Sequence, residues 1–373
     1  MAPSGSQRTP VQVTRLDIRD FRRFGEVSLA PGPGLNLLVG DNGAGKTSVI
    51  EALHLMAYGR SFRGRVRDGL VRSGAAGLEV FVQWTETLPS GERPRRAGLR
   101  HSGSDWAGRL DGESVTQLGE LCAALAVVTF EPGSHDLIHG ASETRRRFVD
   151  WGLFHVEPGF MAPWRRYARA LKQRNALLKQ RIQDDQLDAW DQELAQTGEI
   201  LTEQRRAYLE QLAPHVAGVA ADLGPALGVA SLQYLPGWRR DELPLADALL
   251  LARERDLLAG HTSVGPHRAD WRLAFAAIPG RDALSRGQAK LAALSALLAQ
   301  AELHRAVTGQ SPVFCLDDLA SELDRGHQRR TLERLAGTDS QVFVSGTDVP
   351  AAVAELGLSH RMFHVEHGAV HPV

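Results

Sequence analysis

The chain has 373 residues, of which 43% are hydrophobic and 23% charged, and its formal net charge is −1. This length allows two or three domains, and the composition is that of an ordinary globular protein, which excludes wholesale disorder. The near-neutral charge excludes a chain that is basic throughout, so any nucleic-acid site must be a local patch.

The cysteine content and the absence of long apolar runs indicate the cellular compartment of the protein. Cys122 and Cys315 both stand in apolar segments, which favours buried free thiols over a disulfide framework. The first ten residues lack the apolar core of a signal peptide, and no run approaches the roughly 18 apolar residues that would span a bilayer. We therefore expect a cytoplasmic protein that does not enter a membrane.

The first third of the chain predicts strands around one helix. Residues 11–29 alternate well enough for two strands flanking a basic turn at Arg22 and Arg23. Residues 35–39, LNLLV, form a continuous apolar run of the kind found in buried parallel strands, and apolar side chains recur at helical spacing after Thr47. Residues 78–116 read as strands separated by polar turns.

Helical patterns dominate the middle of the chain, and strands return near its end. Residues 143–260 have helical periodicity, and residues 271–275 have a strand-like pattern. A helix is predicted from about Gly287 to Val307, and two short strands, 312–318 and 341–346, are expected to close the chain.

This order of elements predicts an α/β core assembled from both ends of the chain. We expect residues 1–125 and 306–373 to form that core, and residues 126–305 to form a mostly α-helical inserted second lobe. No sustained heptad pattern is present, so a long coiled coil is not expected.

A phosphate-binding loop follows the first apolar run. Residues 40–47, GDNGAGKT, match G-x-x-x-x-G-K-[ST] at every fixed position. Glycines let the backbone approach phosphate oxygens, the start of the next helix attracts the anion, and the Thr47 hydroxyl can ligate Mg²⁺. A chance glycine turn is the alternative, but the flanking strand and helix argue against it. We therefore predict ATP and Mg²⁺ as cofactors, with nucleotide binding by Gly40, Asp41, Asn42, Gly43, Ala44, Gly45, Lys46, Thr47 and Ser48.

A second apolar strand ends in two aspartates, which is the Walker B form. Residues 313–318 read VFCLDD. Asp317 and Thr47 are predicted metal ligands, and Asp318 stands where many ATPases place a glutamate that activates the attacking water. Two solvated acids are the alternative, which an intact phosphate loop disfavours. Catalysis is accordingly assigned to Asp318 and Lys46.

A third motif points to a site shared by two copies of the chain. Residues 284–288, LSRGQ, lead into a helix and resemble the ABC signature LSGGQ, with Arg286 replacing the first glycine. Ser285, Gly287 and Gln288 are therefore added to the nucleotide-binding set, because a helix N-terminus can cap a γ-phosphate. In ABC ATPases the signature of one subunit meets the phosphate loop of the other. The motif set, with SELD at 321–324, thus predicts an ATP-dependent homodimer.

The spacing of these motifs separates the branches of ABC ATPases. Thr47 and Ser285 stand about 240 residues apart, whereas transporter ATPases place these motifs much closer together. SMC and Rad50-like proteins separate them with long coiled-coil arms, which need heptads that this chain lacks. A transporter subunit, an SMC-type structural protein and a nucleotide-bound protein without a DNA role remain the alternatives.

Further motifs along the chain carry a family resemblance. LDIRDFRRF precedes VGDNGAGKTSVIEAL, and YGRSFR, RRRFVDWGLFH, LKQRNALL, GPHRADW, LSRGQAK and LDDLASELD follow in order. With these motifs the sequence resembles the RecF family of bacterial recombination mediators along essentially its whole length. The resemblance implies an ABC/SMC-type ATPase head, ATP-dependent dimerisation on DNA and slow hydrolysis. It also implies cooperation with RecR and RecO in loading RecA at gaps, in DNA replication and recombinational repair.

Two positions depart from related ATPases. Asp318 is one methylene shorter than the glutamate of transporters, which fits weak hydrolysis. Transporters also carry a histidine where this chain has Ser345-Gly346-Thr347, so no γ-phosphate sensor is assigned. The usual Q-loop glutamine has no clear counterpart, and residues 127–132 stand nearest to its expected place.

Two basic stretches are candidates for contact with DNA, as duplex, junction or single strand. One contains Arg60, Arg63, Arg65, Arg67 and Arg72. In the other, residues 159–183, a row of cations on one helix face suits backbone phosphates, and we predict that this row binds DNA: Arg165, Arg169, Lys172 and Lys179. The alternative is a solvated helix face balanced by the acidic run at 184–193.

Other charged motifs have no assigned role. The Arg145–Arg147 triplet could serve a dimer interface or pair with acids, and His267 and Arg268 could be structural. The histidines near the C-terminus show no convincing metal pattern and are expected at the surface: His364, His367 and His371.

Overall fold

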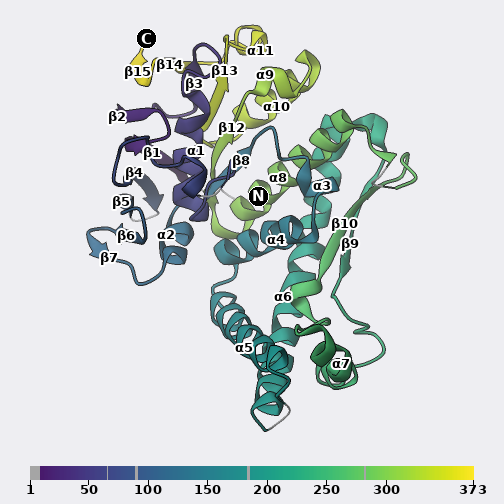
Figure 1. The fold of residues 1–373 in the computed structure, drawn as a ribbon. Helices are drawn as coiled ribbons and strands as arrows, with labels where there is room; N and C mark the ends of the chain where they lie inside the picture. The colour runs from purple at the N-terminus through teal and green to yellow at the C-terminus, as the bar shows by residue number, and fades with distance from the viewer. Residues whose placement is uncertain (1–8, 65, 89–90, 183–184, 281–282) are drawn as a thin grey trace. The chain divides into compact units, whose positions relative to one another are not determined.

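A computed structural model describes residues 9–373 except for 65, 89–90, 183–184 and 281–282 (Figure 1). The chain divides into two units. Unit 1 comprises Met1–Ser134 with Ala301–Val373, and unit 2 comprises His135–Gln300. Both ends of the chain therefore build unit 1. Within the described residues, no helix has the length and apolar content needed to cross a membrane.

The first sheet of unit 1 has six strands in the order β15-β14-β3-β13-β12-β8. Its strands are parallel except for β15, which pairs antiparallel with β14. Their bounds are β3 Leu35–Val39, β8 Val127–Phe130, β12 Val313–Leu316, β13 Val342–Gly346, β14 His360–Glu366 and β15 Ala369–Pro372. Apolar runs such as those of β8 and β12 are buried at every position, as expected for central parallel strands.

The register of the parallel strands places their carboxyl ends at one edge of the sheet. Val39 pairs with Gly346, and Leu316 pairs with both Val344 and Phe130. The loop after β3, the aspartates after β12 and the end of β13 therefore converge. Ligands of open α/β sheets bind at this edge.

The second sheet of unit 1 is largely antiparallel, in the order β11-β1-β4-β5-β6-β7, with β2 also paired to β1. Its strands are β1 Thr9–Phe21, β2 Phe24–Leu29, β4 Leu78–Leu88, β5 Gly91–His101, β6 Trp106–Leu110, β7 Glu113–Ser114 and β11 Gln310–Ser311. Helix α1 (Lys46–Tyr58) contacts strands of both sheets, and one apolar core joins all three layers. The remaining helical elements of unit 1 are η1 Val66–Asp68, α2 Leu118–Ala124, α9 Leu319–Glu322, α10 Arg325–Ala336 and α11 Ala351–Glu355.

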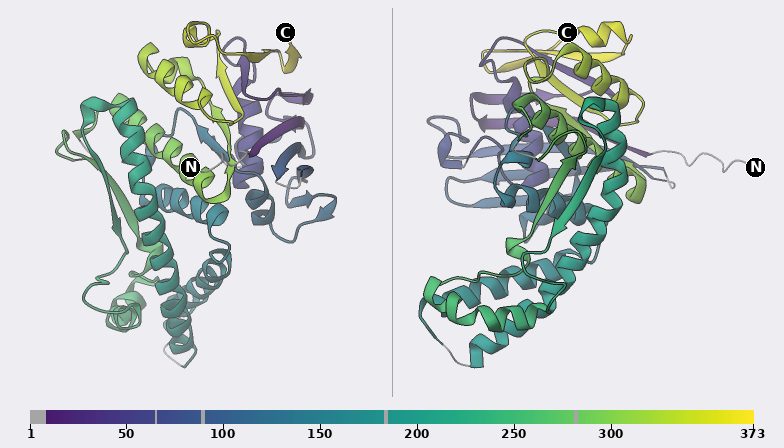
Figure 2. Two further views of the ribbon diagram at one scale, coloured as in Figure 1. Left: turned by 180° about the vertical axis from the view of Figure 1, so that it is seen from behind. Right: turned by 90° about the vertical axis from the view of Figure 1, so that its right-hand side faces the viewer.

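Unit 2 is mostly helical. Its helices are α3 Asp136–His139, α4 Ser142–Val156, α5 Met161–Lys179, α6 Asp185–Leu223 and α7 Leu245–Ala259, with short 3-10 turns at Pro225–Leu227 and Pro266–Arg268. Helices α5 and α6 run side by side (Figure 2). Strands β9 (Ala230–Leu235) and β10 (Asp270–Phe275) form a hairpin-like pair, and α8 (Arg286–Thr308) begins in unit 2 and ends in unit 1.

Three elements differ from the sequence-based expectation. Strands β14 and β15 follow β13, whereas β13 was expected to be the last strand. In β14, Phe363 and Val365 are buried, His364 and Glu366 are exposed and Met362 is half-buried. The alternation of buried and exposed residues is therefore short, and the strand contains two histidines. Strand β9 lies within the stretch expected to be helical, because it completes a pair with β10.

The unit boundaries also differ from the predicted lobe boundaries. Strand β8, which we placed in the second lobe, pairs with β12 and so belongs to the sheet of unit 1. Both cysteines are free thiols. Cys315 is buried as expected, whereas Cys122 is only half-buried.

Candidate nucleotide-binding site

The loop between β3 and α1 is tightly enclosed, which explains its glycines. Gly40 has φ +159°, and a Cβ there would lie 2.1 Å from the carbonyl oxygen of Val365. Gly45 has φ +122°, and a Cβ there would lie 2.8 Å from the ring of Phe24. No side chain fits at either position without moving its neighbours.

The N-terminus of α1 is available to an anion. Gly45 is its N-cap, no side chain caps the helix, and its first turn contains no acidic residue. Uncapped amide groups and the helix dipole together attract phosphate. Lys46 adds a positive charge: its largely buried Nζ donates to the carbonyl oxygens of Gly40 at 2.6 Å and Asp41 at 2.8 Å.

The Walker B aspartate lies beside the phosphate loop. The Thr47 hydroxyl donates to Asp317 Oδ1 at 3.0 Å, although the two residues stand 270 positions apart. Ser345 Oγ lies 2.7 Å from the same oxygen. Burial raises the pKa of the Asp317 carboxyl above its usual value, and the hydrogen bonds from Ser345 and Thr47 act against that shift. Thr47 and Asp317 thus present oxygen atoms of the kind that Mg²⁺ binds. Two protein ligands are enough for Mg²⁺ when phosphate oxygens and water complete its coordination.

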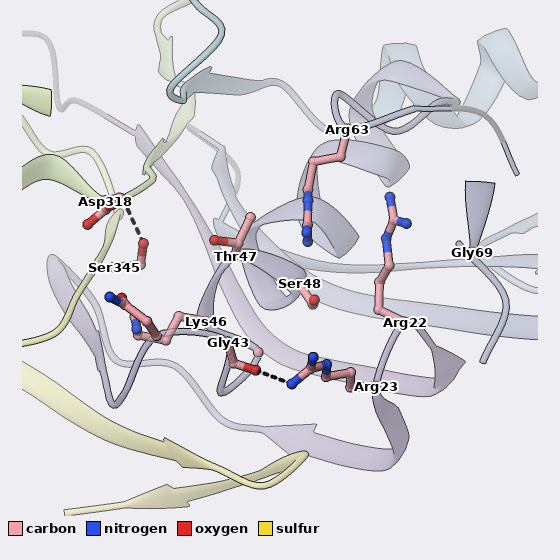
Figure 3. Close-up of a pocket in the computed structure, with 12 residues that line it drawn as sticks. Arg22, Arg23, Gly43, Lys46, Thr47, Ser48, Arg63, Gly69, Asp318 and Ser345 are labelled. Atoms are coloured by element: carbon pink, nitrogen blue, oxygen red, sulfur yellow. Dashed lines mark hydrogen bonds between the residues drawn. The ribbon is translucent and has the colours of Figure 1, made fainter. Parts of the chain in front are cut away.

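The second aspartate faces the same cavity. Asp318 has φ +51° and ψ 44°, and its N–H donates to Ser345 Oγ at 2.8 Å. The cavity measures about 380 Å³ and is lined by Arg22, Arg23, Asn42, Gly43, Gly45, Lys46, Thr47, Ser48, Arg63, Gly69, Asp318 and Ser345 (Figure 3). Figure 3 shows Arg63 extending into it beside Thr47. The structure therefore brings together most of the predicted phosphate-loop residues and Asp318.

Some predicted nucleotide-binding residues do not line this cavity. Asp41 and Ala44 line a neighbouring cavity with Asn42, Gly43 and the β14–β15 hairpin. His364 and His367 are exposed on that hairpin, and His371 is exposed in β15, in line with their predicted surface location. The described residues contain no group of three or more His, Cys, Asp or Glu side chains able to hold a metal ion.

A buried ion-pair network at the other end of the cavity was not predicted. Glu51, in α1, is fully buried and accepts hydrogen bonds from Arg22 Nε at 2.9 Å and Nη2 at 2.6 Å. The Ser61 hydroxyl also donates to Glu51, and Arg63 Nη1 lies 3.6 Å from it. Glu51 thereby orders two arginines that line the cavity. A glutamate within the apolar sequence SVIEAL is the signal that could have indicated such a partner.

The signature residues form a helix cap in unit 2. The Ser285 N–H donates to Gln288 Oε1 at 2.9 Å, and the Gln288 N–H donates to Ser285 Oγ at 3.3 Å. This reciprocal pair is a capping box at the start of α8. Ser285 and Gly287 are exposed there. The contact of this helix end with ATP on a second copy stays a prediction.

The cations predicted to contact DNA are accessible on α5. Arg169, Lys172 and Lys179 are exposed, Arg165 is half-buried, and none of the four forms an ion pair with a described residue. Their neighbour Arg166 is paired with Glu193 at 2.8 Å, and Arg174 is buried between Asp191 and Asp256. The salt bridges of Glu193 and Asp191 on α6 are therefore made with cations other than these four, although, besides Arg166, Arg169 is close enough to help lower the pKa of Glu193. Of the first basic stretch, Arg65 lies outside the described residues.

Two residues of the motifs without an assigned role, His267 and Arg145, make contacts within unit 2. His267 Nε2 donates to the Thr262 carbonyl oxygen at 3.0 Å, and Nδ1 of the neutral ring accepts from the Tyr167 hydroxyl at 2.7 Å. Burial lowers the pKa of His267 to about 4. Arg145 pairs with Asp270 at 2.6 Å. The contact of His267 with Tyr167 connects residues 265–268 to α5. The Arg145–Asp270 pair connects α4 to β10.

Comparison with known proteins identifies relatives over nearly the full chain. The family model for the RecF/RecN/SMC N terminal domain matches residues 12–368. The DNA replication and repair protein RecF of Stenotrophomonas maltophilia (strain R551-3) is 65% identical over 361 residues, covering 96% of this chain and 99% of the relative. The protein of the same name from Shewanella baltica (strain OS223) is 37% identical over 362 residues, covering 96% and 99%.

Solved structures show the same fold. The recombination mediator protein RecF with ATP, described as part of the RecFOR pathway, matches with a TM-score of 0.86 at 24% identity over 100% of both chains. The Smc head domain of Pyrococcus furiosus, bound to the C-terminal domain of ScpA, matches with a TM-score of 0.57 at 14% identity, covering 97% of this chain and 96% of that one. The two-unit α/β architecture is therefore that of an ABC/SMC-type ATPase head.

Proposed function

The chain belongs to the RecF/RecN/SMC N-terminal domain family, and within it to the RecF proteins, and from this premise we propose that it is an ATP-switched DNA-binding protein of replication and recombinational repair. The observation that carries the proposal is the convergence of Lys46, Thr47, Asp317 and Asp318 at one edge of the sheet. A relative at 65% identity is named a DNA replication and repair protein, which supports the biological role.

The residues of the cavity suit ATP binding followed by slow hydrolysis. Lys46 and the N-terminus of α1 would bind the phosphates, and Thr47 and Asp317 would hold Mg²⁺. A bound Mg²⁺ would neutralise charge on the phosphates. Asp318 would orient the attacking water and accept its proton. The short side chain of Asp318 suits slow hydrolysis, as in an ATP-dependent switch, better than rapid turnover.

The partners of this switch are also part of the proposal. ATP would join two copies through the α8 signature, and the cations of α5 would hold DNA while ATP keeps the dimer closed. A similar structure is described as a recombination mediator protein of the RecFOR pathway, which supports RecR and RecO as partners. RecA loading is proposed as the outcome from the family resemblance. We place the protein in the cytoplasm on the same grounds.

Asp318→Asn tests the hydrolytic step. The substitution keeps the side-chain size and removes the carboxylate, so the hydrolysis rate should fall by about 100-fold, the usual contribution of a general base. ATP affinity should change little, because Lys46 and the helix N-terminus are intact, and ATP-bound dimers should accumulate. Phosphate release and sedimentation with ATP measure the two effects.

Asp348→Asn is the matched control for this test. Asp348 is an exposed aspartate just beyond β13 and does not line the cavity. It should hydrolyse ATP at the native rate. Native hydrolysis by Asp318→Asn would show that Asp318 is not the catalytic carboxylate.

Charge reversal on α5 tests the DNA surface. Replacing Arg165, Arg169 and Lys172 by glutamate removes up to three phosphate contacts, so DNA affinity should fall and become less sensitive to salt. The slope of log affinity against log salt should decrease by about 0.9 for each lost contact on duplex DNA and by about 0.7 on single strands. Titration of duplex, junction and single-stranded DNA at several salt concentrations, with ATP and Mg²⁺, measures this slope.

The control reverses three arginines of the same unit that already have acidic partners. Arg206, Arg239 and Arg240 are each within salt-bridge distance of glutamates. Their reversal makes the same change in net charge, and the salt slope should stay close to the native value. Equal slopes for both variants would assign α5 to a solvated surface.

A further inference from the structure

The Ser345 hydroxyl connects the two Walker B aspartates. Ser345 lies in β13, is 1% exposed and lines the nucleotide cavity. Its Oγ is 2.7 Å from Asp317 Oδ1. It is also 2.8 Å from the backbone nitrogen of Asp318, a hydrogen bond drawn in Figure 3. Strand β13 pairs with β12 on one side and β3 on the other, so the sheet itself fixes the position of Ser345.

The direction of these two hydrogen bonds follows from the groups involved. The Asp318 N–H can only donate, so Ser345 Oγ is its acceptor. The single hydroxyl proton of Ser345 then donates to Asp317 Oδ1. A phosphate oxygen can only accept, so the hydroxyl held in this way has no proton left for the γ-phosphate. The geometry therefore indicates that the Ser345 hydroxyl positions the two aspartates and does not contact the nucleotide directly.

Asp318 needs to be held in place. Its left-handed backbone conformation is one that residues with a side chain seldom adopt. Its carbonyl oxygen accepts from the N–H groups of Ser321 at 3.0 Å and Glu322 at 3.1 Å, which fixes the side of the turn that enters α9. The bond to Ser345 fixes the amide side. Without it, the carboxylate of Asp318 would be free to turn relative to the cavity.

Asp317 depends on Ser345 for a related reason. Thr47 and Ser345 both donate to Oδ1 of Asp317. Because Thr47 is also the proposed metal ligand, its hydroxyl has a second use in the same site. Ser345 is not a proposed metal ligand, so its hydrogen bond remains available to orient Asp317 when metal is held there.

We propose that Ser345 is a positioning residue for ATP hydrolysis, fixing Asp317 and Asp318 relative to each other without touching the nucleotide. This role rests on the proposed ATPase function. It assigns a purpose to a serine of the segment Ser345-Gly346-Thr347, the segment in which transporter ATPases carry a histidine. A small displacement of a group that orients the attacking water slows the reaction strongly, whereas the affinity of the phosphate loop is set elsewhere.

Two variants separate positioning from contact with the nucleotide. Ser345→Ala removes the hydroxyl and adds no bulk, and Ser345→Thr keeps it. We expect kcat to fall by about 10- to 100-fold in Ser345→Ala, as for other groups that orient a catalytic site, and to stay near the native value in Ser345→Thr. The Kd of ATP measured by calorimetry without Mg²⁺ should be unchanged in both. Thermal unfolding checks that both are folded.

Combination with Asp318→Asn tests whether Ser345 acts through the aspartate. If it does, Ser345→Ala should cost less in the Asp318→Asn background than it costs in the native protein, because groups that act as a unit are not additive, and the loss that remains reports the bond to Asp317. Multiplied losses in the double variant would overturn the proposal. Native kcat in Ser345→Ala, or a weakened Kd in the absence of Mg²⁺, would also overturn it.

The proposed function can fail separately. A native protein that does not hydrolyse ATP, or whose rate is unchanged in Asp318→Asn, would overturn the ATPase assignment and the role of Ser345 with it. Hydrolysis that depends on Asp318 but not on Ser345 would overturn the role of Ser345 alone.

Discussion

Lys46→Ala is expected to weaken ATP binding by about 30- to 1,000-fold, the usual effect of removing one partner from a largely desolvated charge pair. The ammonium group is buried against the loop and donates to the carbonyl oxygens of Gly40 and Asp41, so it is already positioned where phosphates would lie. Calorimetric titration with ATP measures the loss. ATP-dependent dimerisation and DNA binding should be lost together with it.

The fold should survive this substitution. Two hydrogen bonds from the charged Nζ to loop carbonyls are removed, at about 1.5 to 3 kcal/mol each, and the apolar core around α1 is untouched. Lys172→Ala, which removes an exposed lysine of α5, is the control and should leave ATP affinity unchanged. Native ATP affinity in Lys46→Ala would remove the basis for the nucleotide site.

Most of the phosphate end of the site could be predicted from sequence because its chemistry is local. Residues 40–47 supply the turn, the cation and the metal ligand in one short segment, and the apolar strand before them fixes their place in the sheet. The buried run VFCL likewise predicted where Asp317 and Asp318 emerge. The contact between Thr47 and Asp317 then follows from the order of parallel strands.

The opposite end of the cavity could not be predicted in this way. Arg22, Glu51 and Arg63 come from a turn, a helix and a loop, and they meet only because β1, β2 and α1 pack together. The sequence around Glu51 does not predict which residue pairs with it. Ser345 is similar, since its role depends on the pairing of β13 with β12.

Charge patterns alone also failed to separate paired cations from unpaired ones. Arg165 and Arg166 are neighbours in a basic run, yet Arg166 is paired with Glu193 and Arg165 has no such partner among the described residues. The helical period predicts the face of a residue but not what packs beside it. The hairpin of β14 and β15 was missed because its strands are short and carry exposed histidines.

Ser285→Arg is expected to abolish ATP-dependent dimerisation while leaving ATP binding by each copy intact. Ser285 is exposed at the start of α8, in unit 2, and the phosphate loop belongs to unit 1. In the proposed dimer it faces ATP held by the other copy, so a long side chain there blocks docking of the γ-phosphate. Sedimentation velocity with and without ATP measures the effect, and DNA binding that depends on ATP should fail with it.

Ser285→Ala is the control that separates this block from loss of the helix cap. Ser285 Oγ accepts a hydrogen bond from the Gln288 N–H, and losing such a cap costs about 1 kcal/mol of helix stability. Both variants lose the cap, but only arginine adds bulk. Ser285→Ala should therefore keep measurable ATP-dependent dimerisation. If both variants fail equally, the cap and not the interface explains the defect.

Mixing Ser285→Arg with Lys46→Ala gives the sharpest form of this test. Each variant alone carries a lesion in both composite sites of its homodimer. In a heterodimer, one site combines the Lys46→Ala phosphate loop with the Ser285→Arg signature, and the other combines two native halves. ATP should therefore restore part of the dimer population in the mixture but in neither variant alone. Full ATP-induced dimerisation of Ser285→Arg by itself would place the signature outside the interface and exclude a clamp closed by shared ATP.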